Sequence, residues 1–350
     1  YLYSEAMHGL GIATSRSLAV VKTGEEVVRQ ELHEGAILTR IASSHIRVGT
    51  FEYAAHLQSK ETLKALFDYT LERHFPHLKD KENAAMALLE EVMHRQIALI
   101  NEWMRVGFIH GVMNTDNMSI AGETIDYGPC AFMNAYDPNT VFSSIDTQGR
   151  YAYGNQPAIA HWNIGCMASA LLGLIDENQE TAVEKAKALL QTFPELFRNE
   201  WYCMMGRKTG LIEPDVADKK LVDELLEMMK THQADYTNMF AHLMNIPVPD
   251  HKVYQNEEFL VWKSTWQENI SRRENTASTQ SVMRQANPIY ILRNYLVEEA
   301  LDAYTQHQDN TRFNQLLQRM QDPYAYDEKD KDLQQPPHDG DTYYQTFCNT

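Results

Sequence analysis

The sequence predicts an α+β protein in which a small, partial β lobe is followed by a larger, mainly helical lobe. Two observations predict this order. Aliphatic and β-branched residues gather between residues 18 and 42, where short polar and Gly-containing stretches separate them, as is typical of paired strands. From residue 50 onward, apolar residues recur every three or four positions, as in amphipathic helices. The 350 residues, 43% of them hydrophobic, suffice for a large core or two lobes.

The first fifty residues contain the predicted β structure. Leu18–Lys22 and Glu26–Leu32 are expected to pair as a hairpin around Thr23-Gly24, since Gly readily adopts the backbone of a tight turn. Ala36–Ala42 is a third predicted strand. Ahead of these strands, the apolar spacing of Tyr1–Leu10 predicts the end of an amphipathic helix.

Most of the remaining chain is predicted to be helical. Thr50–Phe75 and Lys81–Val106 have the apolar spacing of long core helices, whereas Phe132–Arg150 has the composition of a loop. Further amphipathic helices are predicted at Pro157–Ile175, Thr181–Phe193, Lys220–Met229, Asp235–Met244, Glu257–Ser271, Pro288–His307 and Asn310–Arg319.

We divide the chain into three parts. Residues 1–49 are taken as the small N-terminal lobe, of which they are only a remnant by the family resemblance given below, and residues 50–321 as the helical lobe with the candidate site. Residues 322–350 are rich in Asp, Pro, Tyr and Gln, so we expect a tail that is poorly ordered or docked.

Charge and cysteine content exclude several classes of protein. A net charge of −17 argues against a general nucleic-acid-binding surface, which needs clustered Lys and Arg. No apolar run approaches the length of a membrane span, so we expect neither nucleic acid nor membrane as a partner. The four Cys show no C-x-x-C pair, which fits a reducing compartment.

The stretch from His110 to Pro129, HGVMNTDNMSIAGETIDYGP, holds the candidate chemistry. Asn117 and Asp126 flank what we predict to be a tight hairpin around Ala121-Gly122-Glu123, and a hairpin brings its two ends together. The two side chains are therefore expected to meet at one hard cation, with Asp116 beside them. Oxygen ligands of this kind suit Mg²⁺, which takes the rest of its shell from water and substrate phosphates.

The spacing of this stretch also indicates a protein-kinase-like site. His110 and Asn117 are seven residues apart, as in the kinase motif H-R-D-x-x-x-x-N, and Asp126-Tyr127-Gly128 stands for D-F-G. The Asp that normally acts as base would be at Val112, and it is missing. Asp116, next to the expected metal ligand, takes its place, which predicts a kinase site with a displaced base.

Each of these residues also has a simpler interpretation. Asp116 and Asn117 could form a turn that stabilises a loop, and Asp126 could be an ordinary turn residue. Taken together with the hairpin and the His spacing, a site is the better explanation. Arg40 and Arg47 have guanidinium groups suited to phosphate, although by spacing alone surface ion pairs are the simpler interpretation.

HGVMNTDNM followed by DYGP resembles the selenoprotein O (YdiU) family, the kinase-fold protein adenylyltransferases. The resemblance runs from residue 1 to the C-terminus. Further matching segments are SEAMHGLGIATSR (Ser4–Arg16), QGRY (Gln148–Tyr151), NQP (Asn155–Pro157) and NPIYILRN (Asn287–Asn294). The resemblance implies that AMP moves from ATP to Ser, Thr or Tyr hydroxyls of proteins, with Mg²⁺ or Mn²⁺ as cofactor and release of pyrophosphate.

The resemblance also implies a role for each candidate residue. Asn117 and Asp126 would hold the metal, Asp126 also contacting the nucleotide, and Asp116 would be the catalytic base. Arg40 and Arg47 would contact the ATP phosphates. Two alternatives remain, a kinase-type phosphotransferase and a non-catalytic pseudokinase. The missing base at Val112 argues against the first, and the intact acidic site argues against the second.

Three further expectations rest on the resemblance. The glycine-rich loop, the nucleotide-contacting Lys and its Glu partner of the family would lie upstream of Tyr1. We therefore expect an N-terminally truncated chain that binds ATP weakly or not at all. Cys348 stands where the family often has selenocysteine or Cys, and Cys130 is the partner to test for a redox-active pair. The location would be cytoplasmic in a bacterium and mitochondrial in a eukaryote.

Overall fold

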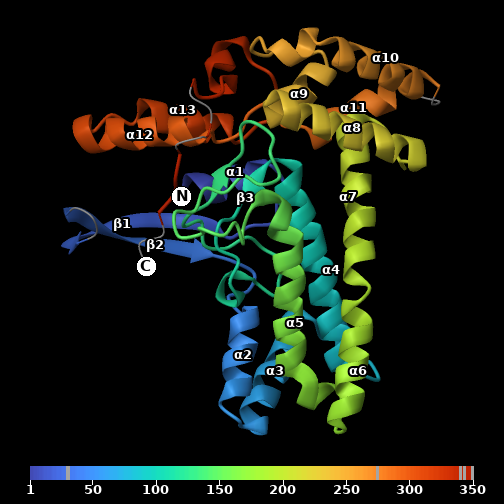
Figure 1. Cartoon of the computed structure of the whole chain (residues 1–350). Helices are drawn as coiled ribbons and strands as arrows, with labels where there is room; N and C mark the ends of the chain where they lie inside the picture. The colour runs from blue at the N-terminus through green and yellow to red at the C-terminus, as the bar shows by residue number, and fades with distance from the viewer. Residues whose placement is uncertain (29–31, 273–275, 339–340, 342–343, 348–350) are drawn as a thin grey trace.

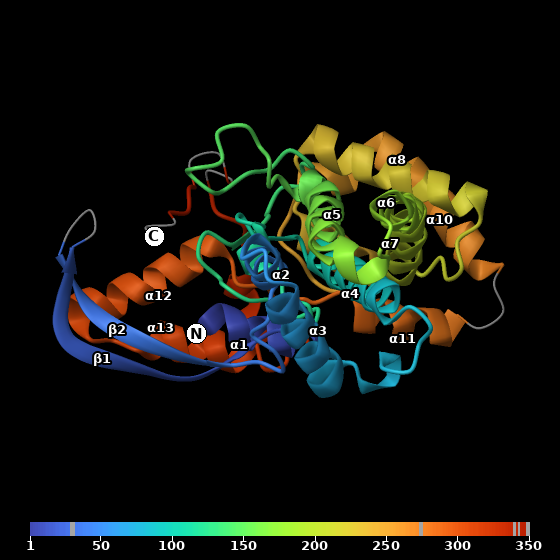
Figure 2. The same ribbon diagram turned by 90° about the horizontal axis from the view of Figure 1, so that it is seen from below.

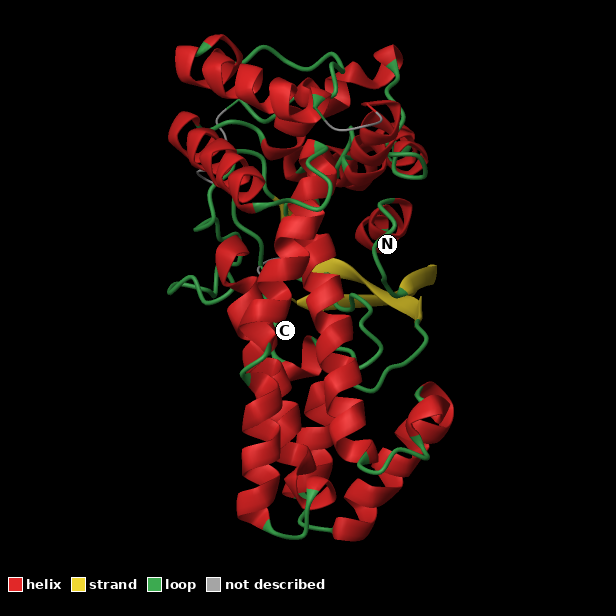
Figure 3. Ribbon diagram, turned by 90° about the vertical axis from the view of Figure 1, so that its right-hand side faces the viewer, coloured by secondary structure: helices red, strands yellow, loops and turns green. Residues whose placement is uncertain are grey.

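The computed structural model describes residues 1–28, 32–272, 276–338, 341 and 344–347. Long helices stand side by side in the lower part of Figure 1, further helices lie across their upper end, and a β ribbon projects to one side. Helices make up most of the structure and strands a small part, as Figure 3 shows by colour. The predicted α+β class, a small β lobe with a large helical lobe, is confirmed.

The β ribbon consists of two antiparallel strands, β1 (Arg16–Val28) and β2 (Leu32–Ile41). The predicted turn at Thr23-Gly24 is wrong, because β1 continues through this dipeptide. The register shifts there by two residues, and Gly24 has φ +77°, so the glycine forms a bulge and not a turn. The strand predicted at Ala36–Ala42 is present as part of β2, so it is the second strand of the ribbon and not a third one. Two further short strands, β3 (Phe108–Ile109) and β4 (Ala131–Phe132), pair antiparallel and bracket the candidate site.

The upright helices form the core of the large lobe. They are α2 (Val48–His56), α3 (Lys60–His74), α4 (Ala84–Arg105), α5 (Gln156–Ile175), α6 (Gln179–Leu190) and α7 (Phe193–Thr209). The single helix predicted over Thr50–Phe75 is in fact α2 and α3. Gln58 has φ +54°, and the Ser59 hydroxyl accepts the Thr62 N–H as the N-cap of α3, so the chain breaks between the two.

The remaining helices lie around the upper end of this bundle. They are α1 (Leu2–Gly9), α8 (Val216–His232), α9 (Tyr236–Leu243), α10 (Glu257–Ser271), α11 (Thr276–Ala286), α12 (Asn294–His307) and α13 (Thr311–Arg319). The helix predicted from Pro288 begins only at Asn294. The six residues before it are buried and not helical, and Ile289 and Tyr290 both donate to the Pro323 carbonyl. In Figure 2, α12 and α13 run alongside the β ribbon, with α1 next to them.

The helix α5 corrects the expectation about membrane spans. Tyr153–Ile175 is long and apolar enough to cross a membrane by length and composition alone. Core helices of soluble proteins pass the same test, and α5 packs against α2, α4 and α6. Its apolar character is therefore explained by its place in the bundle.

The described part of the C-terminal tail is docked. The Thr346 N–H donates to the Phe142 carbonyl, and its hydroxyl donates to the carbonyl of Pro129 at 2.7 Å. The Asp341 carboxylate accepts two hydrogen bonds from Asn134. The tail thus contacts the loop that follows the candidate site, while the division at residues 49 and 321 stays a prediction.

Candidate active site

The predicted hairpin is present between β3 and β4. Met118 and Thr124 form an antiparallel bridge, and the Gly122 N–H donates to the Ser119 carbonyl at 3.1 Å to close the turn. The bridge lies one residue after Asn117 and two residues before Asp126, so it joins the two segments that carry the predicted site residues. The hairpin therefore turns the two ends of the predicted site toward each other.

One side of the hairpin is fixed by the segment that follows α1. The Thr124 N–H donates to the Ala13 carbonyl at 2.8 Å, and the Ser15 N–H donates to the Thr124 carbonyl at 2.9 Å. The Thr124 hydroxyl accepts a bond from Trp103 Nε1 at 2.8 Å. The Tyr127 hydroxyl is hydrogen-bonded to the hydroxyl of Thr14. Asp126 thus lies between Thr124 and Tyr127, which are both hydrogen-bonded to residues 13–15.

The other side of the hairpin is fixed by the segment that precedes α2. The Val48 N–H donates to the Met118 carbonyl at 2.9 Å, and the Ile120 N–H donates to the Ile46 carbonyl at 3.2 Å. Arg47, between the two, faces Ser119 across an antiparallel bridge. This pairing brings Arg47 next to the hairpin, although more than sixty residues separate them in sequence.

The buried His110 ring supports the backbone on both sides of the hairpin. Its Nε2 lies 2.9 Å from the Ile125 carbonyl oxygen, while Nδ1 faces the Val112 N–H at 3.4 Å. A carbonyl requires a donor, so the proton is on Nε2 and Nδ1 accepts. Complete burial lowers the pKa of His110, so the ring is neutral and supports the residue before Asp126.

The three predicted acidic and amide residues lie at the surface of the hairpin. Thr115–Asn117 forms a short 3₁₀ turn with Asp116 exposed and Asn117 half-buried. Asn117 Nδ2 donates to the Val112 carbonyl at 3.0 Å, which leaves Oδ1 free to coordinate a cation. Asp126 is exposed and has φ +61°, a conformation that Asp tolerates better than most residues.

Arg40 and Arg47 are both half-buried. Arg40 lies near the end of β2, opposite Ser17, and Arg47 immediately precedes α2. Within the described ranges neither forms an ion pair, so the surface ion pairs that their spacing allowed are not found there. The Nε of Arg47 is buried with no partner in the same ranges. A buried, unpaired guanidinium nitrogen beside the hairpin fits an anion such as phosphate.

The hairpin offers only a few protein ligands to a divalent metal ion, and such a small number suits Mg²⁺. The described part of the chain has no group of three or more His, Cys, Asp or Glu that could hold a metal ion. Asn117 Oδ1 and the Asp126 carboxylate are the oxygen donors at the hairpin ends. Mg²⁺ is commonly held by one or two carboxylates, with water and phosphate completing its shell, so two protein donors suit a metal that arrives with a nucleotide.

Comparison with known proteins decides the family. The model of the family "Protein adenylyltransferase SelO" matches residues 1–321. The chain belongs to the SelO family. The protein nucleotidyltransferases YdiU of Anoxybacillus flavithermus and Brevibacillus brevis are each 52% identical over 351 aligned positions, and that of Alcanivorax borkumensis is 50% identical. Each match covers 100% of this chain and 72% of the relative.

The SelO assignment confirms the resemblance but leaves two expectations open. The matches cover the whole chain and give no support to the expectation that it is truncated or inactive. Cys348 lies outside the described residues, so its pairing stays a prediction. Cys130 is buried, and burial raises the pKa of its thiol, which makes a reactive thiolate at Cys130 costly.

Sequence reasoning about the SelO site missed the residues that hold the hairpin. Thr124 and Trp103 have no chemical signature of their own, and only the contacts of the folded chain reveal them. Thr14 lies within the SEAMHGLGIATSR segment that carries part of the resemblance, so the family motif was a signal for it.

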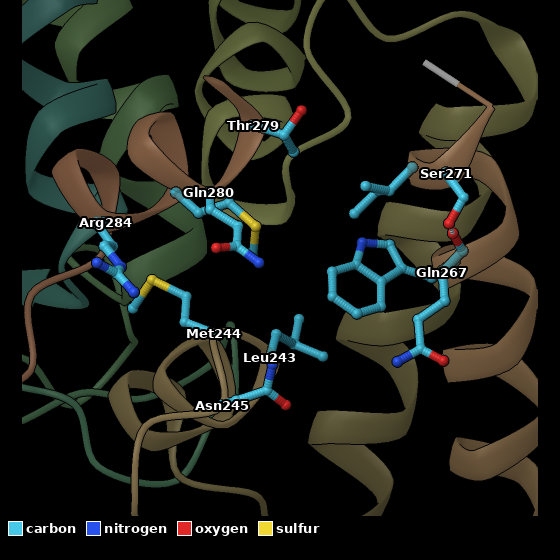
Figure 4. A pocket seen from close by; sticks show the side chains of 11 residues that line it. Leu243, Met244, Asn245, Gln267, Ser271, Thr279, Gln280 and Arg284 are labelled. Carbon is cyan, nitrogen blue, oxygen red and sulfur yellow. Dashed lines mark hydrogen bonds between the residues drawn. The ribbon is translucent and has the colours of Figure 1, made fainter. Parts of the chain in front are cut away.

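A separate cavity of about 340 Å³ lies between α9, α10 and α11. Figure 4 shows Gln267, Gln280 and Arg284 around it. No candidate SelO site residue lines this cavity, so it is distinct from the hairpin site.

Proposed function

We propose that this SelO-family protein transfers AMP from ATP to Ser, Thr or Tyr hydroxyls of proteins and releases pyrophosphate. The observation that carries the proposal is the hairpin, whose Met118–Thr124 bridge joins the segments that carry Asn117 and Asp126, while Arg47 faces Ser119 across a second bridge. The family match supports the reaction class. The bacterial relatives support a cytoplasmic location, and none of those named above supports a mitochondrial one.

Each site residue has its own role in the proposed reaction. Asp116 is exposed and has no hydrogen bond within the described ranges, so its carboxylate is free to take the proton of an acceptor hydroxyl. The hydroxyl oxygen then bonds to the α-phosphorus as the bond from that phosphorus to the pyrophosphate oxygen breaks. The products are protein-bound AMP, pyrophosphate and a proton.

The charge of the triphosphate is offset by two sets of groups. Arg40 and Arg47 bind phosphate oxygens, and the unpaired Nε of Arg47 gains a partner when they do. Asn117 and Asp126 would hold Mg²⁺ or Mn²⁺, and such an ion would supply positive charge to offset that of the phosphates. Orientation of ATP decides between AMP transfer and phosphate transfer, and the absence of an acid at Val112 favours the former.

The test uses ATP labelled at either the α- or the γ-phosphate. The protein is incubated with Mg²⁺ and each form of ATP, with itself and casein as acceptors. We expect label from the α-phosphate alone, and loss of label in Asp126→Asn. Asn keeps the left-handed backbone of residue 126 while removing its charge. Asp80→Asn, at an exposed position, is the matched control and should retain transfer.

Other outcomes identify the alternatives. Label from the γ-phosphate alone would show a kinase-type phosphotransferase. Bound ATP with no label from either position would indicate a pseudokinase. Failure of the protein to bind ATP would contradict the proposed function.

A further inference from the structure

The carbonyl of Leu10, at the end of α1, accepts two side-chain hydrogen bonds. One comes from Arg105 Nη2 at 2.8 Å and the other from the Tyr324 hydroxyl, also at 2.8 Å. Arg105 is at the end of α4, whereas Tyr324 follows α13 near the C-terminus. The end of α1 is therefore held by two distant parts of the chain at one atom.

The Arg105 side chain is itself held in place by several hydrogen bonds. Its Nη1 donates to the Ala286 carbonyl and to the Tyr324 hydroxyl, both at 2.8 Å, and its Nε pairs with Glu102 at 2.6 Å. The side chain is 6% exposed. Arg105, Tyr324 and Leu10 thus close a three-membered ring of hydrogen bonds, which fixes the direction of both donors.

The α1 helix is also pressed against the C-terminal end of α13. A Cβ atom on Gly9 would lie 1.7 Å from the Met320 carbonyl oxygen, so only glycine fits at this position. Met320 is four residues before Tyr324. The contact and the hydrogen bonds to Leu10 therefore belong to one wall formed by residues 320–324.

This wall is connected to the hairpin by a short stretch of chain. Three residues after Leu10, the Ala13 carbonyl accepts both the N–H and the hydroxyl of Thr124, at 2.8 and 2.9 Å. Thr124 is two residues before Asp126. A displacement of residues 10–13 therefore moves the strand that carries the predicted metal ligand.

We propose that Tyr324 and Arg105 are positioning residues for Asp126, acting through the Leu10 carbonyl and Thr124. The proposal rests on the proposed function, because Asp126 is taken there as a ligand of the metal. The segment around Tyr324 then affects the affinity of the site for the metal and ATP as well as covering the core.

The test removes one hydroxyl at a time. Tyr324→Phe keeps the half-buried ring but loses both hydrogen bonds of the hydroxyl. We expect the Mg²⁺ concentration for half-maximal AMP transfer to rise about three- to tenfold, the range that single hydrogen bonds supply. Tyr326→Phe is the matched control, since that hydroxyl bonds only the exposed Glu328, and should leave the Mg²⁺ requirement unchanged.

A double-mutant cycle separates positioning from general stability. Thr124→Val removes the other end of the connection, so its effect on the Mg²⁺ requirement should be non-additive with that of Tyr324→Phe. Additive effects, or a lower melting temperature with an unchanged Mg²⁺ requirement, would overturn the proposal.

A second readout does not need activity. If the wild-type protein transfers no AMP, the proposed function fails, but hydrogen exchange still tests the connection. Faster exchange of the Thr124 and Ser15 amides in Tyr324→Phe, with no change in Tyr326→Phe, would support the proposal. Unchanged exchange at both amides would refute it.

Discussion

Arg293 and Asp235 form a bidentate ion pair in the interior of the protein. The Nη1–Oδ2 distance is 2.7 Å and the Nη2–Oδ1 distance is 3.2 Å, with side chains 1% and 8% exposed. Arg293 immediately precedes α12, and Asp235 caps α9 by accepting the Asn238 N–H at 2.8 Å. Arg293 also donates to Asn134, in the loop after β4. One buried pair therefore joins two helices to the loop next to the candidate site.

Asp235→Ala should destabilise the protein strongly. The substitution leaves the Arg293 guanidinium buried without its carboxylate, which typically costs about 3–5 kcal/mol. Urea unfolding measures the change. Asp68→Ala is the control, because it breaks the exposed Lys64–Asp68 pair, worth roughly 0.5 kcal/mol or less. Equal losses in the two variants would show that burial of the Arg293 pair is not decisive.

Gly49→Ala should impair catalysis more than stability. A Cβ at this position of α2 would lie 3.2 Å from the Asp116 backbone nitrogen and 3.3 Å from the Thr115 carbonyl carbon. The turn that carries Asp116 would have to shift by a few tenths of an ångström, and we expect AMP transfer to fall about tenfold.

Gly173→Ala in α5 is the matched control for this change. No atom lies within 4 Å of a Cβ there, so the variant should gain roughly 0.5–1 kcal/mol of stability and keep its activity. Steady-state transfer and thermal melting measure both effects. A Gly49→Ala protein with wild-type turnover would contradict the close contact with the loop.

Arg47→Met should separate ligand binding from stability. The Nε of Arg47 is buried without a partner in the described structure, so replacing it with an apolar side chain should leave the free energy of unfolding unchanged or raise it by up to about 1 kcal/mol. The loss of a phosphate-binding group should weaken ATP binding about tenfold, measurable by calorimetry. Arg272→Met, at an exposed position, should change neither. Unaltered ATP affinity in Arg47→Met would remove Arg47 from the site.

His242 should make the protein sensitive to acid. Burial, with a smaller effect of Lys263, lowers the pKa of His242 from 6.5 to about 4. The unfolded chain then binds the proton more readily, so the stabilisation is complete above pH 6.5 and is lost as the pH falls through 4. For a half-buried ring this amounts to roughly 1–2 kcal/mol after allowance for solvent screening.

The measurement compares unfolding at pH 7 and pH 4.5. His242→Gln should lose less stability between these values than the wild-type protein. His77→Gln, at an exposed position, should behave like the wild type. The opposite order would mean that His242 is protonated in the folded state.

The structural features that depend on local sequence patterns were predictable. The spacing of apolar residues located α4 and α10 nearly to their observed ends, because a helix must bury one face along its own length. The Asn117–Asp126 hairpin was predictable for the same reason, since a turn depends on adjacent residues. The turn predicted at Thr23-Gly24 was wrong because glycine occurs in both turns and bulges, and only the pairing of β1 with β2 shows which of the two is present.

Contacts between distant segments were not predictable in this way. Nothing near Leu10 indicates Tyr324, and nothing near Thr124 indicates Ala13. The start of α12 at Asn294 likewise depends on Pro323, whose carbonyl accepts hydrogen bonds from Ile289 and Tyr290 and so holds the preceding segment outside the helix. Such features follow from packing of the whole chain, for which a single sequence holds no local signal.

The hydrogen bond between Leu10 and Tyr324 has a consequence for biosynthesis. The two residues are 314 positions apart, so at about 5–20 residues per second a ribosome takes roughly 15–60 s to make the second after the first. During that interval α1 has emerged but lacks the wall against which Gly9 packs. The support of α1, and through Ala13 that of the hairpin, is thus completed only after Tyr324 has been made, and a nascent chain that stalls before residue 320 would hold the hairpin without it.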